Sequence, residues 1–149
     1  MSFEERNAVC GILVCFVTWA IMLTVLLQKS AAGVFEGSAG LEQWARTVLW
    51  LILLGVGIAI AMTILFNIAY AMITGEKKPD FLKDERDTLI GLRGMQATVI
   101  VLTTGIIGAF IALAFGASIL LVMNLILAAC ALSSFASEVT KLVLYRRGL

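Results

Sequence analysis

The sequence predicts an all-α integral membrane protein, a single four-helix transmembrane bundle built from two helical hairpins. Its composition is 61% hydrophobic and only 14% charged, whereas a soluble domain carries about 25% charged residues. A soluble domain of 149 residues with this composition would expose large apolar patches. Four apolar stretches also reach the roughly 20 residues that a bilayer core requires. We therefore expect one transmembrane domain over residues 1–149.

The predicted spans cover about residues 8–27, 44–74, 88–115 and 118–144. Ser2 and Glu5 have the spacing of a capping box, which places the start of the first helix near Phe3. The second span is longer than a perpendicular crossing needs, so we expect tilt or protrusion. Only Gly116 and Ala117 separate the third span from the fourth, which predicts a very tight hairpin.

The orientation of the spans follows from the lysine and arginine residues in their short flanks. One side would hold only Lys29 and Arg46. The other would hold Arg6, Lys77, Lys78, Lys83, Arg86, Arg93, Lys141, Arg146 and Arg147. Cytoplasmic flanks carry the excess of basic residues, so we expect both termini and the middle loop in the cytoplasm.

An internal repeat is visible in the sequence. Residues 4–7 read Glu-Glu-Arg-Asn and residues 84–87 read Asp-Glu-Arg-Asp, and a long apolar run follows each copy. We interpret residues 1–75 and 80–149 as a duplicated two-helix unit, two hairpins related by an axis normal to the membrane. The alternative is that two charged juxtamembrane segments resemble each other by chance.

The repeated acid–arginine pairs, Glu5 with Arg6 and Glu85 with Arg86, would lie at equal depth by this symmetry. We predict that they pair across the pseudo-axis as a clamp between the repeats, since arginine–carboxylate pairs can be bidentate and orienting. The alternative is a set of independent interfacial charges, each of which contributes little.

The Asp-Glu-Arg-Asp stretch at residues 84–87 resembles the motif of a loose group of small, uncharacterised bacterial multi-pass membrane proteins. These proteins carry Asp-Glu-Arg-Asp or Asp-Glu-Arg-Glu ahead of an apolar helix. Residues 4–7 match less well, because Asn7 replaces the final acid. The resemblance implies a bacterial inner-membrane setting and carries no activity with it.

Small or polar residues recur every fourth position in three of the predicted helices, including Gly55, Ala59, Thr63, Gly108, Ala112 and Ser133. Apolar side chains gain little by associating in lipid, so helices there pack through small residues. We interpret these rows as helix-packing seams. A four-residue row drifts around a helix, so part of the row on the second helix would face another subunit. A narrow polar path is the alternative.

Three side chains are costly in hydrocarbon: Asn67, Asn124 and Glu138. Glu138 with Asn67 would make a candidate ion or proton site. The alternative is that Glu138 reaches the headgroup region and pairs with Lys141 one turn further on.

Three aspartates of the middle loop, Asp80, Asp84 and Asp87, would share a helix face if a helix began at Asp80. Such a row can hold Mg²⁺, yet acidic residues in a first turn are also what the helix dipole favours. We therefore predict no cofactor and no metal beyond this candidate.

Composition excludes several function classes. The absence of histidine removes Ser-His-Asp and Cys-His chemistry and the usual haem ligand. A net charge of +1 argues against nucleic-acid binding. Three function classes remain. The first is a non-enzymatic scaffold or accessory subunit, surrounded by membrane lipids, that forms a homo-oligomer or binds another membrane protein. The second is a small oligomeric channel or transporter, and the third is a lipid-directed enzyme that uses the aspartates.

Overall fold

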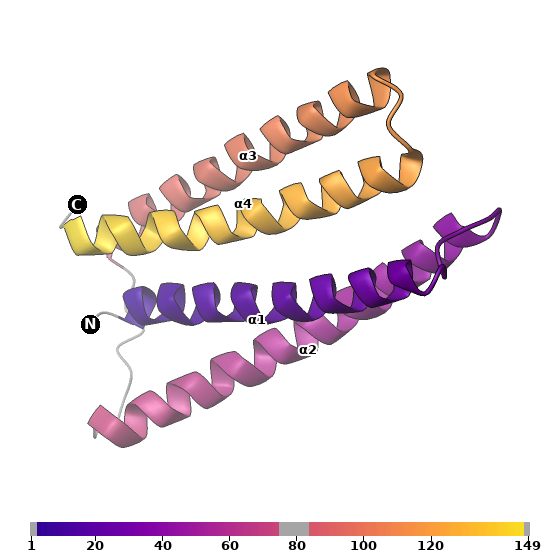
Figure 1. The fold of residues 1–149 in the computed structure, drawn as a ribbon. Helices are drawn as coiled ribbons and strands as arrows, with labels where there is room; N and C mark the ends of the chain where they lie inside the picture. Colours follow the sequence, from indigo (N-terminus) through magenta and orange to yellow (C-terminus); the bar gives the residue numbers. More distant parts are fainter. Residues whose placement is uncertain (1–2, 75–83, 148–149) are drawn as a thin grey trace. The chain divides into compact units, whose positions relative to one another are not determined.

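The computed structural model describes residues 3–74 and 84–147, and every regular element within them is an α-helix (Figure 1). The elements are α1 (Phe3–Ala31), α2 (Gly40–Thr74), α3 (Glu85–Ala114) and α4 (Ile119–Arg147). All four are long and apolar enough to cross a membrane. The prediction of an all-helical, multi-pass membrane protein is confirmed to this extent.

Each helix covers its predicted span closely and mostly runs past it at the charged ends. α1 begins at Phe3 with Glu4 and Glu5 in its first turn, and α4 continues to Arg146 and Arg147. Acidic residues near a helix N-terminus and basic residues near its C-terminus complement the helix dipole. With 35 residues, α2 is about 52 Å long, against a hydrocarbon core of about 30 Å.

The chain divides into two compact units. One comprises Met1–Ile12 with Glu76–Leu149, and the other comprises Leu13–Gly75. The boundary falls inside α1, so the first turns of α1 belong to the same unit as α3 and α4. The predicted repeat, by contrast, divides the sequence between residues 75 and 80.

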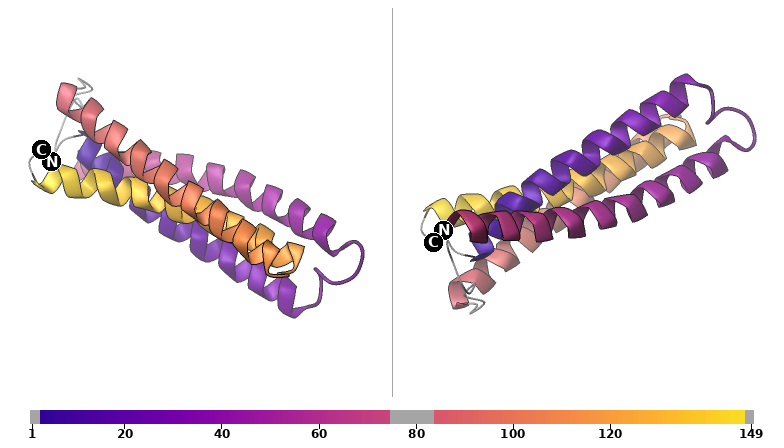
Figure 2. Two further views of the ribbon diagram at one scale, coloured as in Figure 1. Left: turned by 90° about the horizontal axis from the view of Figure 1, so that it is seen from above. Right: turned by 90° about the horizontal axis from the view of Figure 1, so that it is seen from below.

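The first unit contains an antiparallel hairpin of α3 and α4, which run side by side in each view (Figures 1 and 2). The turn between them is closed by hydrogen bonds from Gly116 N to Leu113 O and from Ala117 N to Ala112 O, both 3.0 Å. Gly116 has a φ of 85°, a left-handed conformation that glycine adopts without steric cost. A turn this short holds the two helices in close antiparallel register.

Small residues line the interface between α3 and α4. A Cβ atom on Gly105 would overlap the Cβ of Ala129, so the two backbones approach as closely as glycine permits. Ala109 is 1% exposed and Ser133 is 2% exposed. Close backbone approach of this kind is how helices gain van der Waals contact in lipid.

The second unit pairs the rest of α1 with α2, also antiparallel. Lys29 Nζ donates a 3.0 Å hydrogen bond to Thr47 Oγ1 near the connecting loop. Deeper in the unit, a Cβ on Gly55 would lie 3.7 Å from the Thr18 methyl. Phe35 of the loop is buried, and its carbonyl oxygen leaves no room for a side chain at Gly40.

Candidate functional site

A partly buried ion pair lies on α4, in the segment that the apolar sequence pattern places in the membrane. Lys141 Nζ donates a 2.7 Å hydrogen bond to Glu138 Oε1, and the two side chains are 30% and 20% exposed respectively. Glu138 is nine residues before the end of α4 at Arg147, about 14 Å along the helix. The structure thus brings Glu138 to the partner that its spacing in the sequence indicated.

Two glycines from neighbouring helices make room for this pair. A Cβ on Gly11 of α1 would lie 2.9 Å from three atoms of the Glu138 side chain. A Cβ on Gly94 of α3 would lie 2.8 Å from Lys141 Cε and 3.1 Å from Ser137 Oγ. The carboxylate therefore fills a notch in α1 and the lysine stem fills a notch in α3.

This arrangement neutralises both charges within a helix that is apolar enough to cross a membrane. An isolated carboxylate or ammonium group in hydrocarbon is strongly unfavourable, whereas a carboxylate–ammonium pair carries no net charge. Because Glu138 and Lys141 are held between α1 and α3, the pair also fixes how the three helices meet. We call Gly11, Gly94, Glu138 and Lys141 the ion-pair junction.

The Asp-Glu-Arg-Asp motif begins α3. Asp84 is extended (φ −83°, ψ 160°) and is the N-cap, its Oδ1 accepting a 2.7 Å hydrogen bond from Glu85 N. Asp87 Oδ2 accepts a 3.3 Å hydrogen bond from Asp84 N, which completes a capping box. The motif thus has a local structural role.

Of the expected row of three aspartates, Asp84 is the N-cap of α3 and Asp87 lies in its first turn. Asp80 lies outside the described residues. Within residues 3–74 and 84–147, no three His, Cys, Asp or Glu side chains gather as metal ligands.

The same motif ties the start of α3 to the end of α4. Tyr145 Oη donates a 2.9 Å hydrogen bond to Asp87 Oδ1, and Arg86 Nη2 donates to the Tyr145 carbonyl oxygen at 3.4 Å. Asp87 therefore serves both the cap of its own helix and an interhelical contact. The contact of Tyr145 with Asp87 was not predicted from the sequence.

The members of the predicted charge clamp occupy different environments. Arg6 is 4% exposed and Glu5 is half-buried on α1. Glu85 and Arg86 are exposed at the start of α3. The pairing of Glu5 and Arg6 with Glu85 and Arg86 remains a prediction.

The two intramembrane asparagines bond to their own helices. Asn67 Nδ2 donates to Thr63 O at 2.8 Å, and Asn124 Nδ2 donates to Leu120 O at 2.9 Å. Asn67 Oδ1 is buried without a hydrogen-bond partner among the described residues. Each amide thus satisfies part of its hydrogen-bonding capacity one turn back along the helix.

The predicted seams divide between covered and open positions. Gly55 lies against α1, and Ser133 is buried in the hairpin of α3 and α4. Ala59 and Ala112 are half-buried, while Thr63 and Gly108 are exposed. A Cβ on Gly108 would meet no described atom within 4 Å.

Sequence reasoning overlooked Gly11, Gly94 and the cap at Asp84. The capping box had a readable signal, because Asp84 and Asp87 stand three residues apart directly before an apolar helix. The two glycines had none, since their role depends on helices that are distant in the sequence.

Compared with known proteins, the chain matches no family model, no curated protein and no solved structure.

Proposed function

We propose that this protein is a non-enzymatic integral membrane scaffold or accessory subunit. It would associate laterally with a second copy or with a larger membrane complex. The observation that carries the proposal is a row of small residues on α3, Thr104, Gly108 and Ala112, which we call the open seam; Thr104 and Gly108 are exposed and Ala112 is half-buried. The adjacent row on α3, which includes Gly105 and Ala109, is packed closely against α4.

The open seam has the properties of a packing surface. Gly108 leaves a notch with no described atom within 4 Å, into which a partner helix could approach closely. Thr104 Oγ1 donates a 2.8 Å hydrogen bond to Ile100 O, so its hydroxyl needs no partner on another helix. On α2, Thr63 Oγ1 bonds to Ala59 O in the same way.

The satisfied hydroxyls and the ion-pair junction favour a scaffold over a channel. A polar path would need oxygens directed toward water or an ion, whereas the threonine hydroxyls of these rows bond to their own helix backbones. Glu138, the carboxylate best suited to an ion site, is occupied by Lys141. Lateral packing therefore accounts for more of the polar residues than conduction does.

The proposal includes a topology. Both termini and the middle loop would face the cytoplasm of a bacterial inner membrane, with two parallel-related hairpins in one bundle. The nine-to-two distribution of lysine and arginine supports this orientation. Single cysteines placed at Ser38 and Arg147, in a variant without native cysteines, would test it. A membrane-impermeant maleimide should label position 38 and spare position 147 in intact spheroplasts.

Lateral association is tested by fluorescence energy transfer between donor- and acceptor-labelled copies in lipid vesicles. We expect transfer that falls when lipid dilutes the protein, and we expect Gly108→Leu to abolish it. Gly91→Leu is the matched control, because Gly91 is also open on α3 but lies outside the open seam. Equal transfer in the wild type and the Gly108 variant would contradict an interface at this surface, and proton or cation flux from the same vesicles would favour the channel.

A further inference from the structure

The Leu13–Gly75 unit contains a cavity of about 400 Å³ near the loop that joins α1 to α2. It opens between the last turns of α1 and the first turns of α2. The cavity is lined by Val25, Lys29, Gln43, Arg46, Thr47, Trp50 and Leu51. Its walls thus combine apolar groups with both of the basic residues that the sequence places on this side of the membrane.

Lys29 lines this cavity and has hydrogen-bond donors that are not used within the described residues. Its ammonium group has three N–H donors, and one of them bonds to Thr47 Oγ1 at 3.0 Å. Among the residues that the structure describes, no carboxylate forms an ion pair with Lys29. The side chain is half-buried, so this partly desolvated positive charge has no anionic partner within residues 3–74 and 84–147.

Arg46 supplies a second cation at the same cavity. It pairs with Glu42 one turn earlier on α2, which uses part of a guanidinium that has five donors. The remaining donors suit an oxyanion, since arginine binds phosphate with a planar fork of N–H groups. The cavity therefore offers two cations to one acceptor group.

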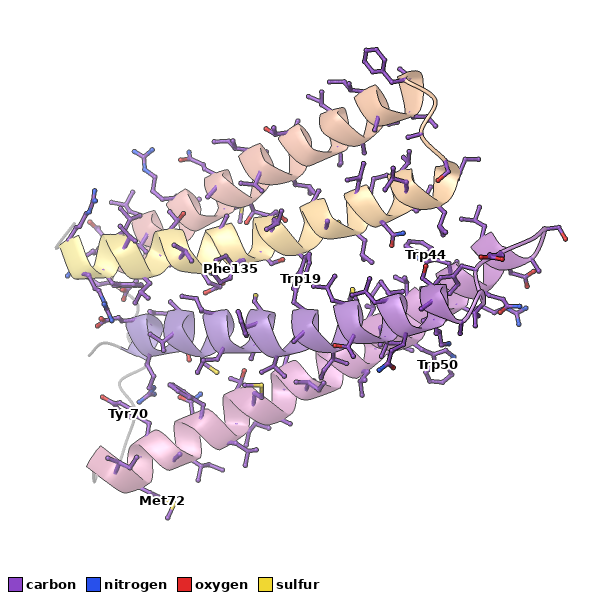
Figure 3. The ribbon with its side chains drawn as sticks, viewed as in Figure 1. Trp19, Trp44, Trp50, Tyr70, Met72 and Phe135 are labelled. Atoms are coloured by element: carbon purple, nitrogen blue, oxygen red, sulfur yellow. The ribbon has the colours of Figure 1, made fainter. Side chains whose placement is uncertain are left out.

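Trp50 completes the site on the lipid side. It is 74% exposed, and it extends from α2 on a different side from Trp44 (Figure 3). Tryptophan is enriched at membrane interfaces, where its ring lies at the level of the headgroups. Val25 and Leu51 provide an apolar wall below it, suited to the start of an acyl chain.

From these features we propose that this cavity binds the phosphate headgroup of an anionic phospholipid. The phosphate would accept hydrogen bonds from Lys29 and Arg46, and the glycerol and upper acyl chain would lie against Trp50 and Leu51. The bilayer supplies this ligand at high local concentration, and the apolar wall gives a lipid contacts that free phosphate lacks. This inference does not depend on lateral association through the open seam.

The test is native mass spectrometry of the protein released from nanodiscs of phosphatidylglycerol and phosphatidylethanolamine in equal amounts. We expect the wild type to retain phosphatidylglycerol preferentially. Lys29→Gln should reduce this retention about tenfold, as expected for losing a charged hydrogen-bond donor. Lys29→Arg should preserve it, because the cation remains.

The controls separate a site from general attraction. Arg93→Gln removes one positive charge from α3, outside this cavity, and should leave retention unchanged. Far-ultraviolet circular dichroism of each variant shows whether the helices are intact. Unchanged retention in the Lys29→Gln, Arg46→Gln double variant would overturn the proposal. So would thermal stabilisation of the detergent-solubilised protein by inorganic phosphate but not by phosphatidylglycerol, since the ligand would then be free phosphate.

Discussion

A Cβ atom on Gly11 of α1 would lie 2.9 Å from the Glu138 carboxylate on α4. Glycine at this position lets the carboxylate approach the α1 backbone, and Lys141 neutralises it at 2.7 Å. The ion pair is thereby partly buried within one unit, with its side chains 20–30% exposed. This junction sets the register of α1 on α4, and the first two predictions test it.

The first prediction compares Gly11 with Gly91, which occupy corresponding positions in the predicted internal repeat. Gly11→Ala should lower the stability of the folded protein by about 1 kcal/mol, because the added methyl group displaces the Glu138 side chain. Gly91→Ala should be neutral or raise stability by up to about 1 kcal/mol, because Gly91 is open and alanine is the better helix former. Steric-trap or thermal unfolding in mild detergent measures both. Equal effects would show that Glu138 does not fill the notch in α1.

The second prediction concerns the charges themselves. Glu138→Gln should destabilise the protein by about 1–2 kcal/mol, because Lys141 loses its partner. This loss of stability is smaller than the loss expected from breaking a fully buried ion pair, since the side chains are 20–30% exposed. The Glu138→Gln, Lys141→Gln double variant should be more stable than the sum of the single variants predicts. An additive double variant would argue against the pair.

Ion flux gives a separate readout on Glu138. If the residue serves only the ion-pair junction, Glu138→Gln in liposomes should show the same background flux as the wild type. Flux in the wild type that the variant abolishes would assign Glu138 to transport.

The third prediction uses neighbouring glycines of α3. Gly105→Ala should cost about 1–3 kcal/mol, because the new methyl group would overlap Ala129 across the hairpin. Gly108→Ala should leave the fold intact, since that position is open. Thermal unfolding monitored by circular dichroism distinguishes them. Similar losses at both positions would mean that the helix faces are assigned incorrectly.

The fourth prediction addresses the contact between the start of α3 and the end of α4. Asp84→Ala should cost about 1 kcal/mol through loss of the N-cap. Tyr145→Phe should cost about 0.5–1.5 kcal/mol through loss of the hydrogen bond to Asp87. A double-mutant cycle of Tyr145→Phe with Asp87→Ala, which removes the acceptor, should show positive coupling, whereas strict additivity would contradict the contact.

The sequence allowed the helices to be predicted well, because a membrane crossing has a length and composition that can be read directly. The apolar span was predicted from residue 8 and the helix start near Phe3, and α1 begins at Phe3, since the backbone stays helical into the charged flank. The tight hairpin was also readable, because only Gly116 and Ala117 interrupt the apolar pattern.

The ion-pair junction and the cap of α3 were harder to predict from the sequence. Glu138 with Lys141 was visible because the two residues are one helical turn apart. The notches at Gly11 and Gly94 depend on the rotation and depth of separate helices, which no local pattern encodes. The cap at Asp84 was not predicted, because Asp80 after Pro79 also carries a helix-start signal.

Native mass spectrometry of the protein extracted from its own membrane into mild detergent or nanodiscs tests lateral association most directly. The account predicts masses of two or more copies, or of the chain with another membrane protein, and a Gly108→Leu variant of normal helicity that yields the single chain. A wild-type protein observed only as a single chain with bound lipid would contradict it.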